Sequence, residues 1–171
     1  MLLIFDTIRD SKKSYLRQRG SNSKKKEMLE VTLNLSLIGI MVMVGIVYFL
    51  VAKSEYEDFK ELSDMGIKGE TAEKQFEVTF FVSSGLVNFI FAVLVLRSHR
   101  TKMPYLISGG ISAALIAIYI ASRTIGVPIV GVEYYVGRLD VISKILQVGA
   151  IVISGIAINN IRSSRALKKI V

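Results

Sequence analysis

Four long runs of apolar residues constrain the fold of this chain more than any other feature. They cover residues 31–52, 78–96, 105–122 and 141–161, and each is about 18–22 residues long. A helix of that length crosses the hydrocarbon core of a bilayer, which is roughly 30 Å thick. No proline interrupts a run, so each can pair its backbone groups as a helix, which the bilayer interior requires. The sequence therefore predicts an all-α integral membrane protein with four transmembrane helices in an antiparallel bundle.

The basic residues are distributed unevenly between the connecting segments. Residues 1–30 hold eight Lys and Arg against four acids, whereas residues 97–104 and 162–171 hold three and four bases and no acid. Residues 53–77 show the reverse, with four bases and eight acids. By the positive-inside rule, this alternation places the N- and C-termini in the cytoplasm of a multi-pass protein of the plasma membrane. The net charge of +8 is then typical of contact with anionic lipid headgroups rather than with nucleic acid.

The domain organisation follows from the same pattern. A basic cytoplasmic tail covers residues 1–30, the membrane domain covers residues 31–161, and a second basic tail covers residues 162–171. The first 16 residues are typical of a helix lying in the inner membrane interface, with a mobile basic tail as the alternative. Residues 20–26, Gly-Ser-Asn-Ser-Lys-Lys-Lys, are typical of a linker.

The acidic extracytoplasmic loop 53–77 has signals of its own. Ser54-Glu-Tyr-Glu57 fits a capping box, and Gly66 can end the helix that would follow. A second helical stretch from about Glu70 is expected to run directly into the second span. The sequence thus predicts a structured acidic hairpin outside the membrane.

Polar residues that could carry chemistry lie around the connection between the last two spans: Arg123, Glu133, Asp140, Lys144 and Gln147. Asp140, Lys144 and Gln147 share one helix face, because they are spaced i, i+4 and i+7. In one interpretation, Arg123 at a helix C-terminus pairs with Asp140 at a helix N-terminus, with Lys144 reaching toward Asp140 or Glu133. In a second, the five residues form a pocket for a small ligand or ion between helices. A catalytic centre is the third.

Metal and cofactor chemistry lacks suitable ligands. The chain has no cysteine, which excludes disulfides and thiolate sites, and its one histidine, His99, lies in a basic inner connection. A serine nucleophile would need a partner base, and none is apparent. We therefore expect no catalytic residue, no metal site and no cofactor, and a chain that is not an enzyme by itself.

Small and polar residues within the spans indicate helix packing. The steps Ser108/Ser112, Gly109/Ala113 and Ala150/Ser154 allow close backbone approach, either within the chain or against a neighbour. Hydrogen bonds between helices are expected from the polar residues of the first two spans, namely Asn34, Ser36, Ser83, Ser84 and Asn88.

One stretch resembles a known pattern. Arg123-Thr-Ile-Gly126-Val-Pro128, followed by Glu133, Gly137 and Asp140, resembles a turn found in four-span membrane proteins of bacteria and archaea, over residues 105–158. Those chains often carry an acid where this one has Gln147, which argues against a proton relay. In composition the chain also looks like proteins of ammonia-oxidising archaea, where small membrane proteins accompany ammonia monooxygenase. The resemblance implies an accessory role, because the histidines of the copper-bearing subunits are missing.

The sequence therefore favours a non-catalytic accessory or structural subunit of a multi-subunit membrane complex. The specific candidate is the archaeal ammonia monooxygenase complex, and the partners would be other integral membrane subunits and lipids. The alternative is a small membrane transporter or channel that uses a polar pocket in the outer leaflet. Many transporters bind their substrate at a helix that is interrupted within the membrane. No proline interrupts a span in this chain, so the subunit is the preferred hypothesis.

Overall fold

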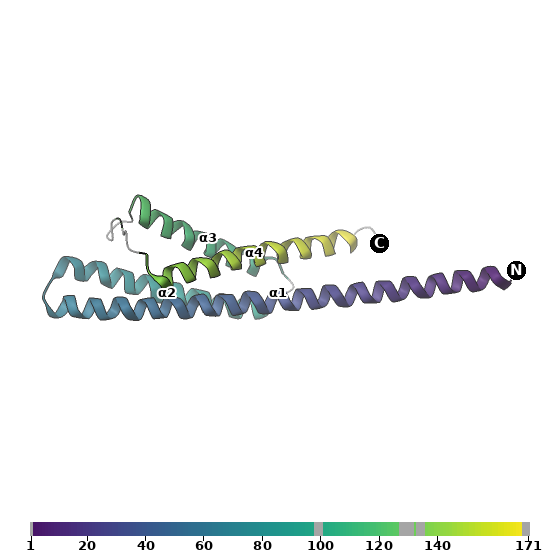
Figure 1. The fold of residues 1–171 in the computed structure, drawn as a ribbon, viewed down its shortest axis with the longest axis horizontal. Coiled ribbons are helices and arrows are strands. Elements are labelled where there is room, and N and C mark those ends of the chain that lie inside the picture. The colour runs from purple at the N-terminus through teal and green to yellow at the C-terminus, as the bar shows by residue number, and fades with distance from the viewer. Residues whose placement is uncertain (1, 98–100, 127–131, 133–135, 169–171) are drawn as a thin grey trace. The chain divides into compact units, whose positions relative to one another are not determined.

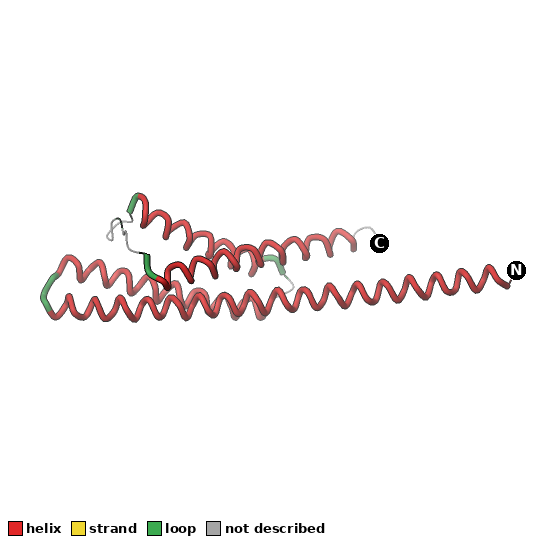
Figure 2. Tube along the Cα trace, in the orientation of Figure 1, coloured by secondary structure: helices red, strands yellow, loops and turns green. Residues whose placement is uncertain are grey.

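The computed structural model describes residues 2–97, 101–126, 132 and 136–168. They form four α-helices in chain order: α1 (Leu2–Asp64), α2 (Lys68–Arg97), α3 (Met103–Thr124) and α4 (Arg138–Lys168) (Figure 1). Figure 2 shows that helix accounts for nearly all of this part of the chain. Each helix contains an apolar stretch long enough to cross a membrane, so the predicted all-α class and the four candidate spans are confirmed.

The chain divides into two compact units, Met1–Leu33 and Asn34–Val171. The first unit is the N-terminal part of α1, and it is helical through residues 20–26. The prediction of a linker at this place was wrong. A glycine inside a helix costs only about 1 kcal/mol relative to alanine, and residues 1–33 contain no proline that would interrupt the backbone hydrogen bonds.

In the second unit, buried side chains recur every three to four residues along each helix. On α1 the buried side chains include Leu37, Met41, Val44 and Tyr48, and on α4 they include Ser143, Gln147, Ala150, Ser154 and Ala157. Buried positions on α2 and α3 follow the same spacing: Ser84, Asn88, Ala92 and Val95, then Ser108, Ser112 and Leu115. This spacing is that of left-handed helix packing. Many of these positions are polar or small, as expected where helices pack without a hydrophobic driving force.

Helices α1 and α2 approach closely at a pair of glycines that the sequence analysis overlooked. A Cβ atom added at Gly45 would lie 2.8 Å from Phe89 Cε2 and 3.3 Å from the Gly85 carbonyl oxygen. A Cβ added at Gly85 would lie 3.2 Å from Phe49 Cε2. Each glycine thus accommodates the phenylalanine of the other helix, and the two rings pack with centroids 5.9 Å apart.

The turn between α1 and α2 confirms the predicted role of Gly66. This residue has φ 76°, a conformation that glycine adopts without steric cost. Its N–H donates to the Ser63 carbonyl at 3.1 Å, and the Ile67 N–H donates to the Leu62 carbonyl at 3.2 Å, which is the Schellman arrangement. The predicted helix start at Ser54 was wrong, because α1 runs through that residue without a break.

A three-residue ion cluster joins α1 and α2 between their apolar runs and this turn. Lys74 Nζ donates to Glu55 Oε2 at 2.6 Å and to Glu77 Oε2 at 2.8 Å. The side chain of Glu77 is only 11% exposed. Charge-assisted bonds of this length are among the stronger polar contacts in proteins. The hairpin formed by residues 53–77 is therefore held together by more than its turn.

Candidate functional site

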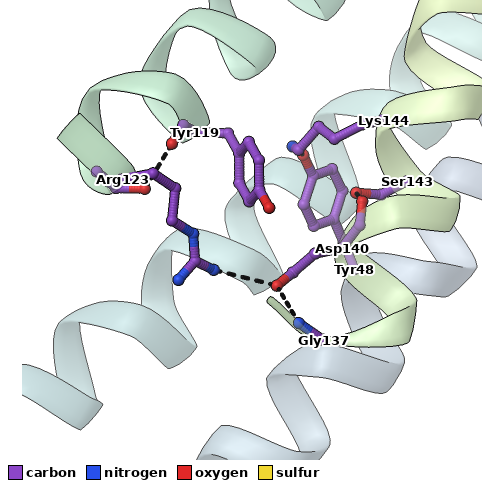
Figure 3. A network of polar contacts seen from close by, with 8 residues as sticks. Tyr48, Tyr119, Arg123, Gly137, Asp140, Ser143 and Lys144 are labelled. Atoms are coloured by element: carbon purple, nitrogen blue, oxygen red, sulfur yellow. Dashed lines mark hydrogen bonds and ion pairs between the residues drawn. The ribbon is translucent and has the colours of Figure 1, made fainter. Parts of the chain in front are cut away.

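Helices α1, α3 and α4 bring a set of polar side chains together at the end of the bundle where α3 ends and α4 begins. We call these residues the polar cluster: Tyr48, Tyr119, Arg123, Asp140, Lys144 and Gln147. Figure 3 shows most of them around the first turns of α4. Within α3 and within α4, the grouping of these residues follows from helix periodicity. Tyr119 and Arg123 share a face of α3 at i and i+4, and Asp140, Lys144 and Gln147 share a face of α4.

Arg123 and Asp140 form the ion pair that the sequence predicts. Arg123 Nη2 lies 3.2 Å from Asp140 Oδ2, and the two side chains are 15% and 22% exposed. The same carboxylate oxygen accepts the backbone N–H of Gly137 at 3.1 Å, so Asp140 also satisfies a donor at the start of α4. The pair joins the C-terminal end of α3 to the N-terminal end of α4, where the helix dipoles favour these signs.

Deeper in the bundle, Gln147 links α4 to α1. Its Nε2 atom donates to Tyr48 Oη at 2.6 Å, and its side chain is fully buried. Lys144 Nζ donates to Gln147 Oε1 at 3.2 Å and to the same Tyr48 oxygen at 3.5 Å. The three side chains therefore form a closed set of hydrogen bonds between two helices.

Aromatic rings surround the Lys144 ammonium group. Its Nζ atom lies 4.7 Å from the centroid of the Tyr119 ring and 5.8 Å from that of Tyr48. The Arg123 guanidinium carbon lies 5.0 Å from the same Tyr119 centroid, and Figure 3 shows the ring standing between the two cations. Each such contact stabilises a cation by about 0.5–2 kcal/mol, depending on its exposure to water.

The structure brings four of the five predicted site residues together: Arg123, Asp140, Lys144 and Gln147. The fifth, Glu133, lies outside the described residues. Two carboxylate partners were predicted for Lys144, Asp140 and Glu133, and only Asp140 is among the described residues. Within the described part of the chain Lys144 forms no ion pair with Asp140 or with any other carboxylate, and it turns toward Gln147 and the two tyrosines.

Sequence reasoning missed Tyr48 and Tyr119. Both lie in apolar runs, where a tyrosine is usually counted with the hydrophobic residues. One available signal was that Tyr119 precedes Arg123 by four residues, and another was that Tyr48 is the only tyrosine of the first run. Neither signal shows by itself that the two rings meet Lys144, because that depends on how α1, α3 and α4 are rotated.

Polar contacts elsewhere in the bundle serve helix packing. The Tyr105 hydroxyl donates to Asn34 Oδ1, which confirms one predicted hydrogen bond between helices. Asn88 instead donates to the Ser84 carbonyl of its own helix at 2.8 Å. Ser36 and Ser83 are exposed.

The small residues of α3 and α4 were predicted to pack either within the chain or against a neighbour, and at Gly109 they pack within the chain. A Cβ atom on Gly109 would lie 3.3 Å from Ser154 Cβ. Ser108, Ser112 and Ala150 are buried along the same stripe, whereas Ala113 is exposed.

The chemistry available to the polar cluster is that of charge pairing and hydrogen bonding. Among the described residues there is no group of three or more His, Cys, Asp or Glu side chains that could hold a metal ion. In comparisons with known proteins, no family model, curated protein or solved structure matches this chain.

Proposed function

We propose that this chain is a non-catalytic subunit of a larger membrane assembly, which its four helices help to build. The observation that carries the proposal is the way its buried and partly buried polar groups pair with one another. Arg123 with Asp140 joins α3 to α4, Gln147 with Tyr48 joins α4 to α1, and Tyr105 with Asn34 joins α3 to α1. Side chains used in this way fix helix positions, which is the task of a structural subunit.

The surface of the bundle agrees with this role. Apolar side chains that are more than half exposed occur on all four helices, for example Leu35, Ile90, Ile120 and Ile145. Lipid tails or neighbouring subunits would cover such residues equally well.

The charge distribution supports a topology in which both termini are cytoplasmic and the α1–α2 hairpin projects outside the plasma membrane. Helix α1 continues from residue 53 to Asp64 beyond its apolar run, which corresponds to roughly 18 Å of helix. Glu57, Glu61 and Asp64 are exposed on this projection. The Lys74 cluster holds the hairpin in one conformation, so the projection offers partner subunits a preorganised acidic surface.

For the assembly itself, we propose the archaeal ammonia monooxygenase complex. The support is the composition, rich in Ile and Lys and free of Cys, which looks like that of proteins from ammonia-oxidising archaea. The Arg123–Asp140 segment resembles a turn of four-span membrane proteins of bacteria and archaea in general and does not point to one complex. The chain would be an accessory subunit there, since its single histidine cannot supply a copper site of imidazole ligands.

Purification from native membranes in mild detergent, followed by native mass spectrometry, tests the subunit proposal. We expect companion chains in fixed stoichiometry. Neutralising the projection with Glu57→Gln, Glu61→Gln and Asp64→Asn should weaken their retention. The matched control is Lys53→Gln with Lys60→Gln, which changes exposed charges of the same hairpin in the opposite sense. A chain that runs as a lone monomer would refute the proposal.

A second candidate is a small transporter or channel with its polar pocket at the polar cluster. The observation in its favour is Lys144, a cation within an apolar run for which the described residues provide no carboxylate partner. The four helices cross their apolar runs without a break, whereas many transporters bind substrate at interrupted helices. Ion or solute flux in proteoliposomes that Asp140→Asn abolishes would favour this candidate, and absence of flux would exclude it.

A further inference from the structure

We propose that Lys144 is the centre of a binding site for a phosphate group, and that its occupant is the headgroup phosphate of a membrane lipid. Lys144 is the only Asp, Glu, Lys or Arg residue in the four apolar runs. Charged residues at such positions are rare and face a partner of opposite charge or a water-filled cavity. This inference does not depend on the chain being a subunit, because a lone monomer could bind the lipid equally well.

The first step is the charge balance at this end of the bundle. The described residues around the start of α4 include the cations Arg123, Arg138 and Lys144 and the single anion Asp140. Asp140 Oδ2 is already engaged by Arg123 and by the Gly137 N–H. It also occupies the N-terminus of α4, so the helix end itself is not the proposed site. Among the described residues, Lys144 is therefore the cation of the cluster that has no carboxylate within ion-pair distance.

The second step is how the ammonium group is held. Gln147 Oε1 and Tyr48 Oη accept two of its three hydrogens, and the Tyr119 ring lies 4.7 Å away. All these groups are neutral, so they orient the cation without cancelling its charge. A preorganised and partly buried cation of this kind attracts a single anionic group more strongly than a freely moving surface lysine does.

The third step is depth. Lys144 is the fourth residue of its apolar run, so its backbone lies roughly 5 Å inside the end of the run. A lysine at that depth directs its ammonium group toward the headgroup region. Basic sites between transmembrane helices are a known kind of binding site for the phosphate groups of lipids. A lipid also reaches the site sideways through the bilayer, which a soluble anion cannot do.

The test uses the full-length chain, delipidated in mild detergent and titrated with phosphatidylglycerol or phosphatidylcholine, with bound lipid counted by native mass spectrometry. The wild-type chain should retain phosphatidylglycerol in preference to phosphatidylcholine. Lys144→Gln should lower that affinity about fivefold, which corresponds to about 1 kcal/mol for one lysine. Lys144→Arg should retain most of it. Arg138→Gln, which removes an exposed charge at the same end of α4, should change it less than twofold.

Each alternative has its own result. Equal losses in Arg138→Gln and Lys144→Gln would show general attraction to the surface and overturn the proposal. Inorganic phosphate that stabilises the wild-type chain but not Lys144→Gln, with no preference between the lipids, would assign the site to a free anion. A membrane subunit lost with Lys144→Gln while lipid retention stays unchanged would assign Lys144 to a partner's carboxylate. A wild-type chain without any preference for phosphatidylglycerol would overturn the proposal even if the variants failed to fold.

Discussion

The crossing of α1 and α2 at Gly45 and Gly85 gives the sharpest prediction for stability. In Gly45→Ala the new methyl group would lie 2.8 Å from Phe89 Cε2, where carbon atoms prefer about 3.5–4.0 Å. Rotation of the Phe89 ring could relieve that overlap. It could not relieve the second contact, because the Gly85 carbonyl oxygen at 3.3 Å belongs to the backbone of α2. The two helices must therefore move apart or remain strained.

The expected cost is that of overpacking a closely fitted site, about 1–3 kcal/mol in the free energy of unfolding. Alanine also raises helix propensity relative to glycine by up to about 1 kcal/mol, which would hide part of this cost. Gly39→Ala is the matched control for that gain. Gly39 lies on the same helix, is exposed, and has nothing within 4 Å of an added Cβ. The difference in stability between the two variants isolates the strain.

Equilibrium unfolding of the full-length chain in mixed micelles, followed by circular dichroism as the fraction of denaturing detergent rises, measures this difference. Gly45→Ala should be less stable than Gly39→Ala by about 1–3 kcal/mol. Adding Phe89→Leu to Gly45→Ala should recover part of the loss, since it removes the ring that meets the new methyl group. If the two alanine variants were equally stable within about 0.5 kcal/mol, the close approach of α1 and α2 would be refuted.

Three further predictions concern the polar contacts and the topology. Gln147→Leu should lower the free energy of unfolding by about 1–2 kcal/mol. A double-mutant cycle with Tyr48→Phe should give a coupling energy between the two side chains above about 0.5 kcal/mol, and additive effects would contradict the hydrogen bond. Lys74→Gln should lower the free energy of unfolding by about 1–3 kcal/mol, because it leaves the carboxylates of Glu55 and Glu77 close together. The control Lys53→Gln should lower it by less than about 0.5 kcal/mol, because the contact of Lys53 with Glu57 is exposed and 3.9 Å long. Because the chain has no cysteine, a single cysteine at Lys24 should be labelled only from the cytoplasmic side and one at Glu61 only from outside, and the opposite pattern would overturn the proposed topology.

Much of the helical architecture could be predicted because hydrophobic length is a strong signal. Each of the four apolar runs lies within one helix of the structure. The Gly66 turn was predictable for a similar reason, since glycine adopts its backbone conformation without strain. The Arg123–Asp140 pair followed from opposite charges at two adjacent helix ends.

The two wrong predictions, a helix start at Ser54 and a linker at residues 20–26, relied on local sequence signals that contribute little free energy. Ser54 has the sequence of a helix cap, but a cap stabilises a helix start by only about 1 kcal/mol, so it does not interrupt a helix that already continues from the preceding turn. Residues 20–26 have the composition of a linker, yet no residue among them forbids helix. The contacts of Tyr48, Tyr119 and Gly45 were not accessible, because they depend on the relative rotation of helices that are far apart in the chain.

The polar contacts of α1, α3 and α4 have a geometry that a reaction centre would not require. Among the described residues, each pair of these helices has at least one such contact: Tyr48 with Gln147, Arg123 with Asp140, and Asn34 with Tyr105. A slip of α4 by one turn, about 5.4 Å, would break the first two contacts together. Apolar packing alone would resist such a slip weakly, because lipid tails are as apolar as the helix surface. The polar residues therefore fix the depth and rotation of these helices, and Lys144, which forms no ion pair within the described part of the chain, is the residue from which binding should be sought.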